Sequence, residues 1–190
     1  MIKAELREIY LRERKSISAT ELHQHSFKIY QQFFSHVDLS FTKIVHSFIP
    51  IVRNGEPDTW LIIDRIRREF PHVRLSIPRI NSATNSLENF FFEGLHQLEE
   101  NKMGIKQPKQ SVPTPSQKID LVLVPLLIFD EQGNRVGYGK GCYDKFLATC
   151  RPDCQRIGIS IFPPIKSIQD TNVHDIKLTA CITPEKIYSF

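Results

Sequence analysis

The chain has 190 residues, of which 41% are hydrophobic and 24% charged, and it carries a formal charge of +4 at pH 7. A chain of this size and composition can bury one hydrophobic core without disulfides or a structural metal, so we expect a single domain over residues 1–190. The longest apolar run, residues 121–129, is interrupted by Pro125 and is far shorter than the about 20 residues of a membrane-spanning helix. The mild positive charge is spread along the chain, which does not imply binding to nucleic acid.

Residues 1–15 alternate charges and contain no apolar signal segment, so we expect a cytoplasmic protein. Four cysteines with irregular spacing are expected to stay reduced in that compartment. Cys150 and Cys154 have a spacing that can begin a zinc site, but the sequence offers no second Cys or His pair to complete it.

Two helices are expected at the start of the chain. Residues 3–15 carry apolar side chains along one helical stripe, which favours an amphipathic helix. Ser18 and Glu21 have the spacing of a capping box, in which each side chain binds the other residue's backbone amide. They predict a second helix that extends to about residue 35.

A βαβ unit follows. Residues 43–49 and 73–77 are β-branched runs typical of strands, and a helix is expected between them, beginning near Pro57 and ending at Pro71. Two such strands joined by a helix favour parallel pairing with a right-handed crossover.

The remaining pattern completes an α/β protein. Residues 102–118 contain several prolines and predict a long loop, whereas 119–124 form a continuous apolar run typical of a central parallel strand. The other expected elements are strands at 89–93, 156–161 and 178–182 and a helix at 142–149. We therefore predict a three-layer α/β/α sandwich with a mostly parallel central sheet.

A glycine-rich segment, residues 135–144 (RVGYGKGCYD), lies between a predicted strand and a helix. Glycines at alternate positions leave backbone amides open to a ligand, and the positive end of the next helix favours an anion such as phosphate. Arg135 and Lys140 add full positive charges. The spacing matches neither common nucleotide motif, so a tight glycine-rich turn without a ligand is the alternative.

Further candidate ligand residues lie outside this loop. Lys3 and Arg7 share a helical face and could bind a polyphosphate, although a solvated basic face is the plainer interpretation. Asp144 and Asp175 are candidate magnesium ligands, with ordinary exposed loop carboxylates as the alternative. Glu56 precedes a helix and either binds free backbone amides there or faces a ligand.

Short segments over nearly the whole chain together resemble one family, the 5-formyltetrahydrofolate cyclo-ligases. The most specific block runs from Arg135 to Leu147. The other segments are Lys3-x-x-Leu6-Arg7, Glu56-Pro57-Asp58-Thr59, Ile77-Pro78, Gly104-Ile105, residues 119–125, Phe129-Asp130, His174-Asp175 and Ile182-Thr183.

The resemblance implies a fold similar to that of sugar-phosphate isomerases and CoA-transferases. It also implies an ATP- and magnesium-dependent enzyme that converts 5-formyltetrahydrofolate, with or without a polyglutamate tail, to 5,10-methenyltetrahydrofolate. In that reaction the γ-phosphoryl group passes to the formyl oxygen, N10 closes the ring, and ADP and phosphate are released. We expect a monomer that has a small-molecule substrate and does not bind nucleic acid or membranes.

The resemblance also implies roles for individual residues. Arg135 and Lys140 would act in catalysis, and Asp144 and Asp175 would bind the metal. ATP would contact Lys3, Arg7, Arg135, Gly137, Tyr138, Gly139, Lys140, Gly141, Cys142 and Tyr143. The folate would contact Ile51, Glu56, Tyr138 and Tyr143.

The chain departs from the family pattern at several positions. The family usually has an aromatic residue in place of Cys142, Glu in place of Gln107, Tyr in place of Phe48 and Gly in place of Leu126. The resemblance implies that Cys142, in place of an aromatic ring, weakens packing against the pterin. Cys142 and Gln107 make a catalytically silent folate-binding domain the main alternative. An isomerase or transferase that works without ATP, and an RNA-binding module, are further alternatives of other classes.

Overall fold

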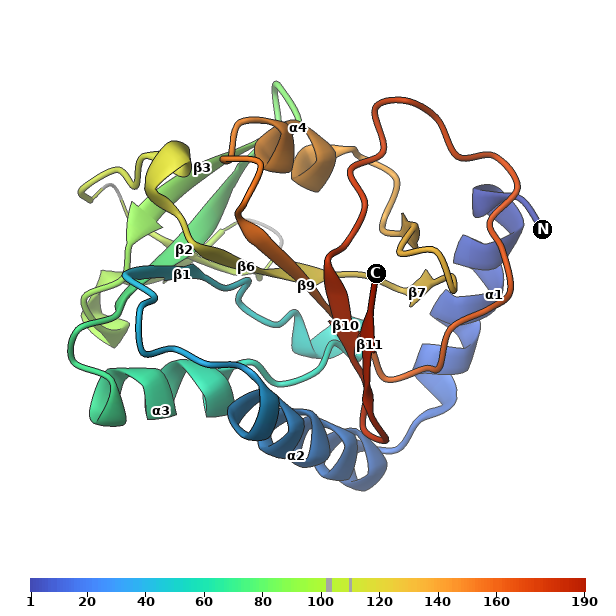
Figure 1. The fold of residues 1–190 in the computed structure, drawn as a ribbon, viewed down its shortest axis with the longest axis horizontal. Coiled ribbons are helices and arrows are strands. Elements are labelled where there is room, and N and C mark those ends of the chain that lie inside the picture. Colours follow the sequence, from blue (N-terminus) through green and yellow to red (C-terminus); the bar gives the residue numbers. More distant parts are fainter. Residues whose placement is uncertain (102–103, 110) are drawn as a thin grey trace.

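The computed structural model describes residues 1–101, 104–109 and 111–190. A seven-stranded sheet in the order β11-β10-β9-β6-β1-β2-β3 forms its centre (Figure 1). The five inner strands are parallel, and the edge strands β3 and β11 are antiparallel to their neighbours. The strands are β1 (Ile44–His46), β2 (Arg74–Asn81), β3 (Ser86–Phe91), β6 (Leu121–Pro125), β9 (Gln155–Ile159), β10 (Ala180–Ile182) and β11 (Ile187–Ser189).

Helices and two short hairpins surround this sheet. The helices are α1 (Lys3–Ser16), α2 (Ala19–His36), α3 (Trp60–Glu69) and α4 (Cys142–Ala148), with single 3-10 turns at Val52–Asn54, Leu95–Gln97 and Ser116–Lys118. The hairpins pair β4 (Leu98–Glu100) with β5 (Lys106–Pro108) and β7 (Ile128–Phe129) with β8 (Arg135–Val136). The βαβ unit β1-α3-β2 is parallel, as predicted.

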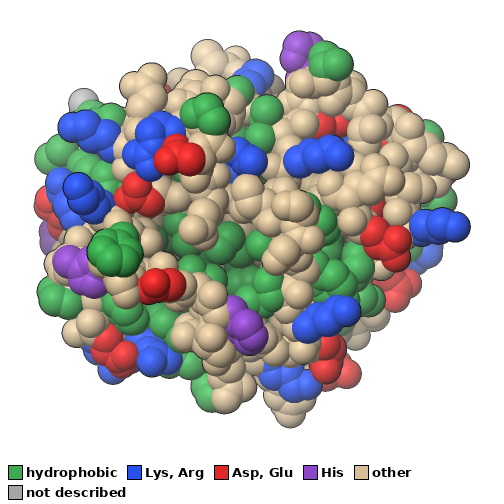
Figure 2. Space-filling view, viewed as in Figure 1, with side chains coloured by type: hydrophobic (Ala, Val, Ile, Leu, Met, Phe, Trp, Pro, Cys, Tyr) green, Lys and Arg blue, Asp and Glu red, His purple; other side chains and the backbone are tan. Residues whose placement is uncertain are grey.

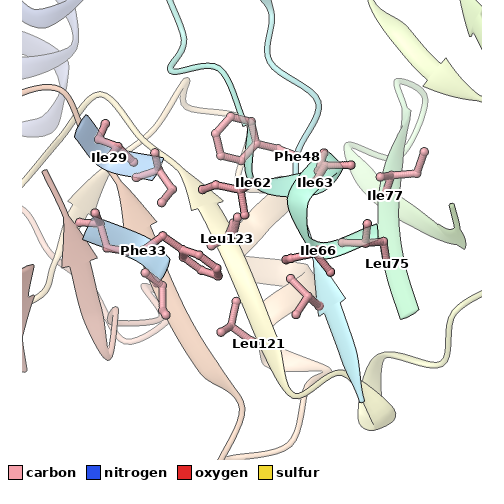
Figure 3. Packing of buried hydrophobic residues seen from close by; sticks show 14 of the residues in the cluster. Ile29, Phe33, Phe48, Ile62, Ile63, Ile66, Leu75, Ile77, Leu121 and Leu123 are labelled. Atoms are coloured by element: carbon pink, nitrogen blue, oxygen red, sulfur yellow. The ribbon is translucent and has the colours of Figure 1, made fainter. Parts of the chain in front are cut away.

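The face of the sheet covered by α2 and α3 carries the larger core. The capping box predicted for α2 is present, since Glu21 N donates to Ser18 Oγ at 3.2 Å and Ser18 N donates to Glu21 Oε2 at 2.9 Å. Each large side chain buried in this core contributes roughly 1.5–3 kcal/mol. Figure 3 shows isoleucines and a phenylalanine of the helices against the strands: Ile29, Phe33, Ile62, Ile63 and Ile66 against Leu75, Ile77, Leu121 and Leu123.

The opposite face is covered by α4. Phe146 and Leu147 of this helix pack with Val122 and Val124 of β6 in a second core. The helix α1 lies beside the β7–β8 hairpin (Figure 1), where its buried Leu6 belongs to a third, smaller core. The predicted α/β class with a mainly parallel central sheet is confirmed.

Several predicted boundaries were wrong. The helix expected from Pro57 begins only at Trp60, because Asp58 N donates to Ser26 Oγ of α2 while Asp58 Oδ1 accepts from Trp60 N. The strand expected at 73–77 continues to Asn81, because β2 forms a long antiparallel hairpin with β3.

Two further expectations changed at the periphery. The predicted loop 102–118 contains β5, and residues 102–103 and 110 of that prediction lie outside the described residues. The edge strand β11, which pairs with β10, was not predicted because its few residues carry no strand pattern.

The surface is mixed in charge. Figure 2 shows one face, on which Lys and Arg side chains are interspersed with Asp and Glu and hydrophobic side chains gather near the middle. The positive side chains on this face do not form a continuous stripe of the kind that RNA-binding proteins present. Within the described part of the chain, we find no helix that is both long and apolar enough to span a bilayer.

Candidate active site

A cavity of about 300 Å³ lies where the parallel strands β1 and β6 end at their carboxyl termini. This edge of an open α/β sheet is where ligands usually bind. Every site residue predicted from the sequence borders this one cavity. They are Lys3, Arg7, Ile51, Glu56, Arg135, Gly137, Tyr138, Gly139, Lys140, Gly141, Cys142, Tyr143, Asp144 and Asp175.

The glycine-rich loop is held against α1 by Arg7. Its Nε donates to the carbonyl oxygen of Gly137 at 3.0 Å. Gly139 has φ +90°, and a Cβ there would lie 3.2 Å from Arg7 Cζ, so a larger residue would be strained and would push the guanidinium away. A Cβ on Gly137 would meet no atom of the described chain within 4 Å, so the loop at this point faces open space that a ligand can enter.

Arg135 lies in β8, directly before the glycines of this loop. Its side chain is only 7% exposed, its Nη2 lies 2.7 Å from Asp144 Oδ1, and its Nη1 donates to the carbonyl oxygen of Ile176. Burial lowers the pKa of Arg135, and the neighbouring Asp144 opposes that shift. Ile176 N also donates to Asp144 Oδ1, at 3.0 Å, so the pair is anchored to the backbone.

A second ion pair joins α1 to the loop before β10. Lys3 Nζ lies 2.5 Å from Asp175 Oδ2, which also accepts from Asn172 N at 2.7 Å. The backbone amide of Lys3 donates to Asp170 Oδ1 at 2.7 Å, which fixes the first turn of the helix. Lys140, by contrast, makes no ion pair with any residue in 1–101, 104–109 or 111–190, so its ammonium group is available to a ligand.

The two carboxylates fit a magnesium ion that is bound jointly with a phosphorylated ligand. Among the described residues, no hydrogen bond reaches Asp144 Oδ2 or Asp175 Oδ1, so each carboxylate keeps one oxygen for a cation. The described part of the chain holds no cluster of three or more His, Cys, Asp or Glu that could bind a metal alone. Magnesium commonly takes only one or two protein carboxylates and fills its shell with water and phosphate oxygens.

Glu56 is a buried carboxyl group in the wall of the cavity, only 5% exposed. Its Oε1 accepts from Tyr138 Oη at 2.6 Å, and its Oε2 accepts from the backbone amide of Ile51 at 2.7 Å. Burial raises the pKa of Glu56, and the two hydrogen bonds partly oppose this. Burial and the neighbouring carboxylate also raise the pKa of Tyr138.

Sequence reasoning missed the apolar wall of the cavity. It combines the end of β1 with the β2–β3 hairpin and the start of β5, and its residues include Phe48, Ile49, Pro78, Ile80, Leu87 and Ile105. The hairpin was not predicted, so nothing in the sequence pointed to Ile80 or Leu87. Tyr143 also lies here, and its buried hydroxyl has no hydrogen-bond partner among the described residues, which leaves one donor for a ligand.

Basic side chains and a glycine loop on one side of the cavity, with an apolar wall on the other, are typical of one class of protein, the α/β enzymes that act on small molecules. The comparisons with known proteins narrow the class. The model of the 5-formyltetrahydrofolate cyclo-ligase family matches residues 1–183, and the chain belongs to that family.

Individual relatives agree with this assignment. The chain is 31% identical over 143 residues to the 5-formyltetrahydrofolate cyclo-ligase of Escherichia coli K12, covering 72% of this chain and 76% of the relative. Its fold is similar to that of the 5,10-methenyltetrahydrofolate synthetase of Aquifex aeolicus, with a TM-score of 0.81 at 23% identity, covering 100% and 93% of the two chains. The corresponding synthetase from Mycoplasma pneumoniae matches with a TM-score of 0.73 at 21% identity over 97% and 99%.

Proposed function

We propose that the chain closes the ring of 5-formyltetrahydrofolate to give 5,10-methenyltetrahydrofolate, with ATP as co-substrate and ADP and phosphate as products. The formyl oxygen is a poor leaving group. Transfer of the γ-phosphoryl group to that oxygen turns it into phosphate, which can depart once N10 has attacked the formyl carbon. The chemistry makes little demand on protein acids or bases, and most of the work is alignment and charge stabilisation.

The observation that carries this proposal is the two-sided cavity. Its basic side suits a triphosphate, and its apolar side suits the flat face of a pterin ring. Because both sides border the same space of about 300 Å³, two ligands bound there would meet. Phosphoryl transfer between them requires such contact, with the reacting atoms about 3 Å apart.

On the basic side, the cationic side chains differ in whether they already have an ion-pair partner. Lys140 has no partner among the described residues, whereas Lys3 and Arg135 are paired with Asp175 and Asp144. We propose that Arg135 and Lys140 stabilise the charge that develops on the transferred group, and that Lys3 and the glycine loop hold the remaining phosphates. The anchored guanidinium of Arg135 is preorganised for this, because the Ile176 carbonyl fixes its direction.

On the apolar side, Glu56 is the polar group that orients the folate. A carboxylate offers about four acceptor sites, and Tyr138 and Ile51 occupy two of them. The remaining sites suit the adjacent N–H donors on the edge of a pterin ring. The unpartnered hydroxyl of Tyr143 is a further donor to the folate or to the formyl oxygen.

Asp144 and Asp175 would hold the magnesium ion. When bound, the ion neutralises part of the charge on the phosphate oxygens. The cytoplasmic location and the monomeric state stay predictions, and so does acceptance of a polyglutamate tail.

The test is a spectrophotometric assay of the purified chain for the methenyl chromophore, with 5-formyltetrahydrofolate, ATP and magnesium each omitted in turn. We expect the chromophore only in the complete mixture, with ADP formed in a 1:1 ratio to it. Product formed without ATP would overturn the phosphorylation route. Folate binding by calorimetry with no turnover would instead support the silent binding domain, for which the departures at Cys142 and Gln107 in the cavity wall are the motive.

A further inference from the structure

Arg14 is a buried cation outside the cavity. It lies in the last turn of α1 and is only 2% exposed, although the cost of burying a guanidinium is high unless its donors are bound. It does not border the cavity, so nothing in the proposed reaction accounts for it so far.

Its donors reach two segments of the site. Arg14 Nη1 donates to Tyr138 Oη at 2.9 Å, and Nη2 donates to the carbonyl oxygen of Leu126 at 2.5 Å. Arg14 Nε has no partner among the described residues, which is a further cost of keeping the side chain here. A chain that only needed a packed helix would do better with an apolar residue at this position.

The hydrogen bond to Tyr138 has a fixed direction. A guanidinium is a donor only and stays charged, so the Tyr138 oxygen must accept from Arg14. The single proton of the phenol is then left for Glu56, whose Oε1 lies 2.6 Å away. The result is a series of two hydrogen bonds with a fixed donor direction, from Arg14 through Tyr138 to Glu56. A buried cation lies at one end and a buried carboxylate at the other.

The stem of Arg14 also positions the backbone next to Glu56. Gly55 has φ +62°, and a Cβ there would lie 3.0 Å from Arg14 Cγ and 3.3 Å from Arg14 O. The residue before Glu56 therefore packs directly on this side chain. From α1, Arg14 thus contacts the glycine loop, the residue after β6 and the loop that carries Glu56.

We propose that Arg14 is a positioning residue that, through Tyr138, keeps the buried Glu56 carboxylate ionised and aimed at the folate. The inference rests on the proposed function for the folate role of Glu56. Its electrostatic part does not, because it concerns two side chains and a phenol within the fold.

Among the described residues, few charged or titratable groups face Glu56. Arg14 approaches from α1, Tyr138 from the glycine loop, and the phenol of Tyr143 from α4. Burial is the main influence on the carboxyl group and favours its neutral form, whereas the hydrogen bonds from Tyr138 and from the Ile51 amide and, after them, the charge of Arg14 favour the anion. Removing Arg14 takes away the cation and also frees the phenol proton to point elsewhere.

The test measures the titration of the Glu56 carboxyl group. The carboxyl carbon of Glu56 in the full-length chain, labelled with ¹³C and assigned with Glu56→Gln, is titrated by NMR in the wild type and in Arg14→Met, Arg14→Lys and Tyr138→Phe. We expect the midpoint to rise by roughly one to two pH units in Arg14→Met and in Tyr138→Phe, and by less in Arg14→Lys. The matched control is Arg12→Met on the exposed side of the same helix, for which no shift is expected.

Binding provides the second measurement. At pH 7 we expect the Kd for 5-formyltetrahydrofolate to rise about tenfold or more in Arg14→Met, with the Kd for ATP changed less than twofold. An unchanged midpoint in a folded Arg14→Met protein would overturn the inference, and if that variant does not fold, an unchanged midpoint in Tyr138→Phe does so. A wild type that binds no folate while the midpoints shift as expected overturns the proposed function and not the electrostatic link.

Discussion

Replacing Arg135 with alanine should separate the stability of the site from its chemistry. The variant loses the ion pair with Asp144 at 2.7 Å and the hydrogen bond to the Ile176 carbonyl. Breaking a fully buried ion pair costs about 3–5 kcal/mol, but Asp144 is 30% exposed and keeps the amide of Ile176, so water can solvate much of its charge. We therefore expect a loss of about 2 kcal/mol in the free energy of unfolding.

The loss of activity should be larger than the loss of stability predicts. Removing one preorganised group that stabilises transition-state charge slows the reaction by on the order of 10²-fold or more. The protein stays mostly folded after losing about 2 kcal/mol, since native stabilities are typically 5–15 kcal/mol. The rate is measured as ATP-dependent formation of the methenyl chromophore at saturating substrates, and stability is measured by urea unfolding.

Arg151→Ala is the matched control. Arg151 pairs with Asp120 at 2.9 Å and Asp153 at 3.0 Å, but its side chain is 38% exposed and lies outside the cavity. We expect only a small loss of stability from these exposed pairs, and activity within about twofold of the wild type. If Arg135→Ala turned over as fast as this control, the assignment of Arg135 to phosphoryl transfer would be refuted.

Other predictions concern packing, pH and the cavity wall. Gly158→Ala should lower the free energy of unfolding in urea by about 1–3 kcal/mol, because its Cβ would lie 2.7 Å from both Leu126 and Leu178 side chains; an unchanged value would contradict this packing. Burial lowers the pKa of His46 from 6.5 to about 4, so the unfolded chain binds a proton first as the pH falls. Stability should then drop by about 2 kcal/mol between pH 7.5 and pH 5, and this drop should be absent from the His46→Gln profile. Cys142→Tyr should lower the KM for the folate several-fold in the chromophore assay, since an added ring extends the aromatic surface of the cavity; a raised KM would count against folate contact at this position.

The parts of the fold that follow from local chemistry were predictable. The capping box of Ser18 and Glu21 marks the start of α2, and the apolar run at β6 marks a strand buried on both faces. The β2–β3 hairpin was missed because its turn contains no glycine and relies on Asn85, which adopts φ +48°. Pairing over six residues of each strand, together with burial of Phe90 and Phe91, outweighs that strain.

In the site, too, features encoded in a local stretch of sequence could be predicted, whereas contacts between distant segments could not. The glycine loop and its two basic residues could be found from spacing and charge, and the family motifs pointed to the other predicted site residues, but nothing pointed to Ile80 and Leu87 of the apolar wall. The link from Arg14 through Tyr138 to Glu56 could not be found this way, because it joins three segments far apart in the sequence. One signal was available, since Arg14 follows Lys3 by eleven residues and therefore lies on the same helical stripe.

The ion pairs of the cavity couple the binding of two of its proposed ligands, the triphosphate and the divalent cation. Lys3 and Arg135 are held by Asp175 and Asp144, so a triphosphate that binds these cations must compete with the carboxylates. A divalent cation that binds the carboxylates weakens their hold on both basic side chains. Each ligand therefore removes a competitor of the other, and by thermodynamic linkage the favourable effect is the same in both directions. The two ion pairs also offset the repulsion among closely spaced basic groups. They therefore stabilise the fold when no ligand is bound.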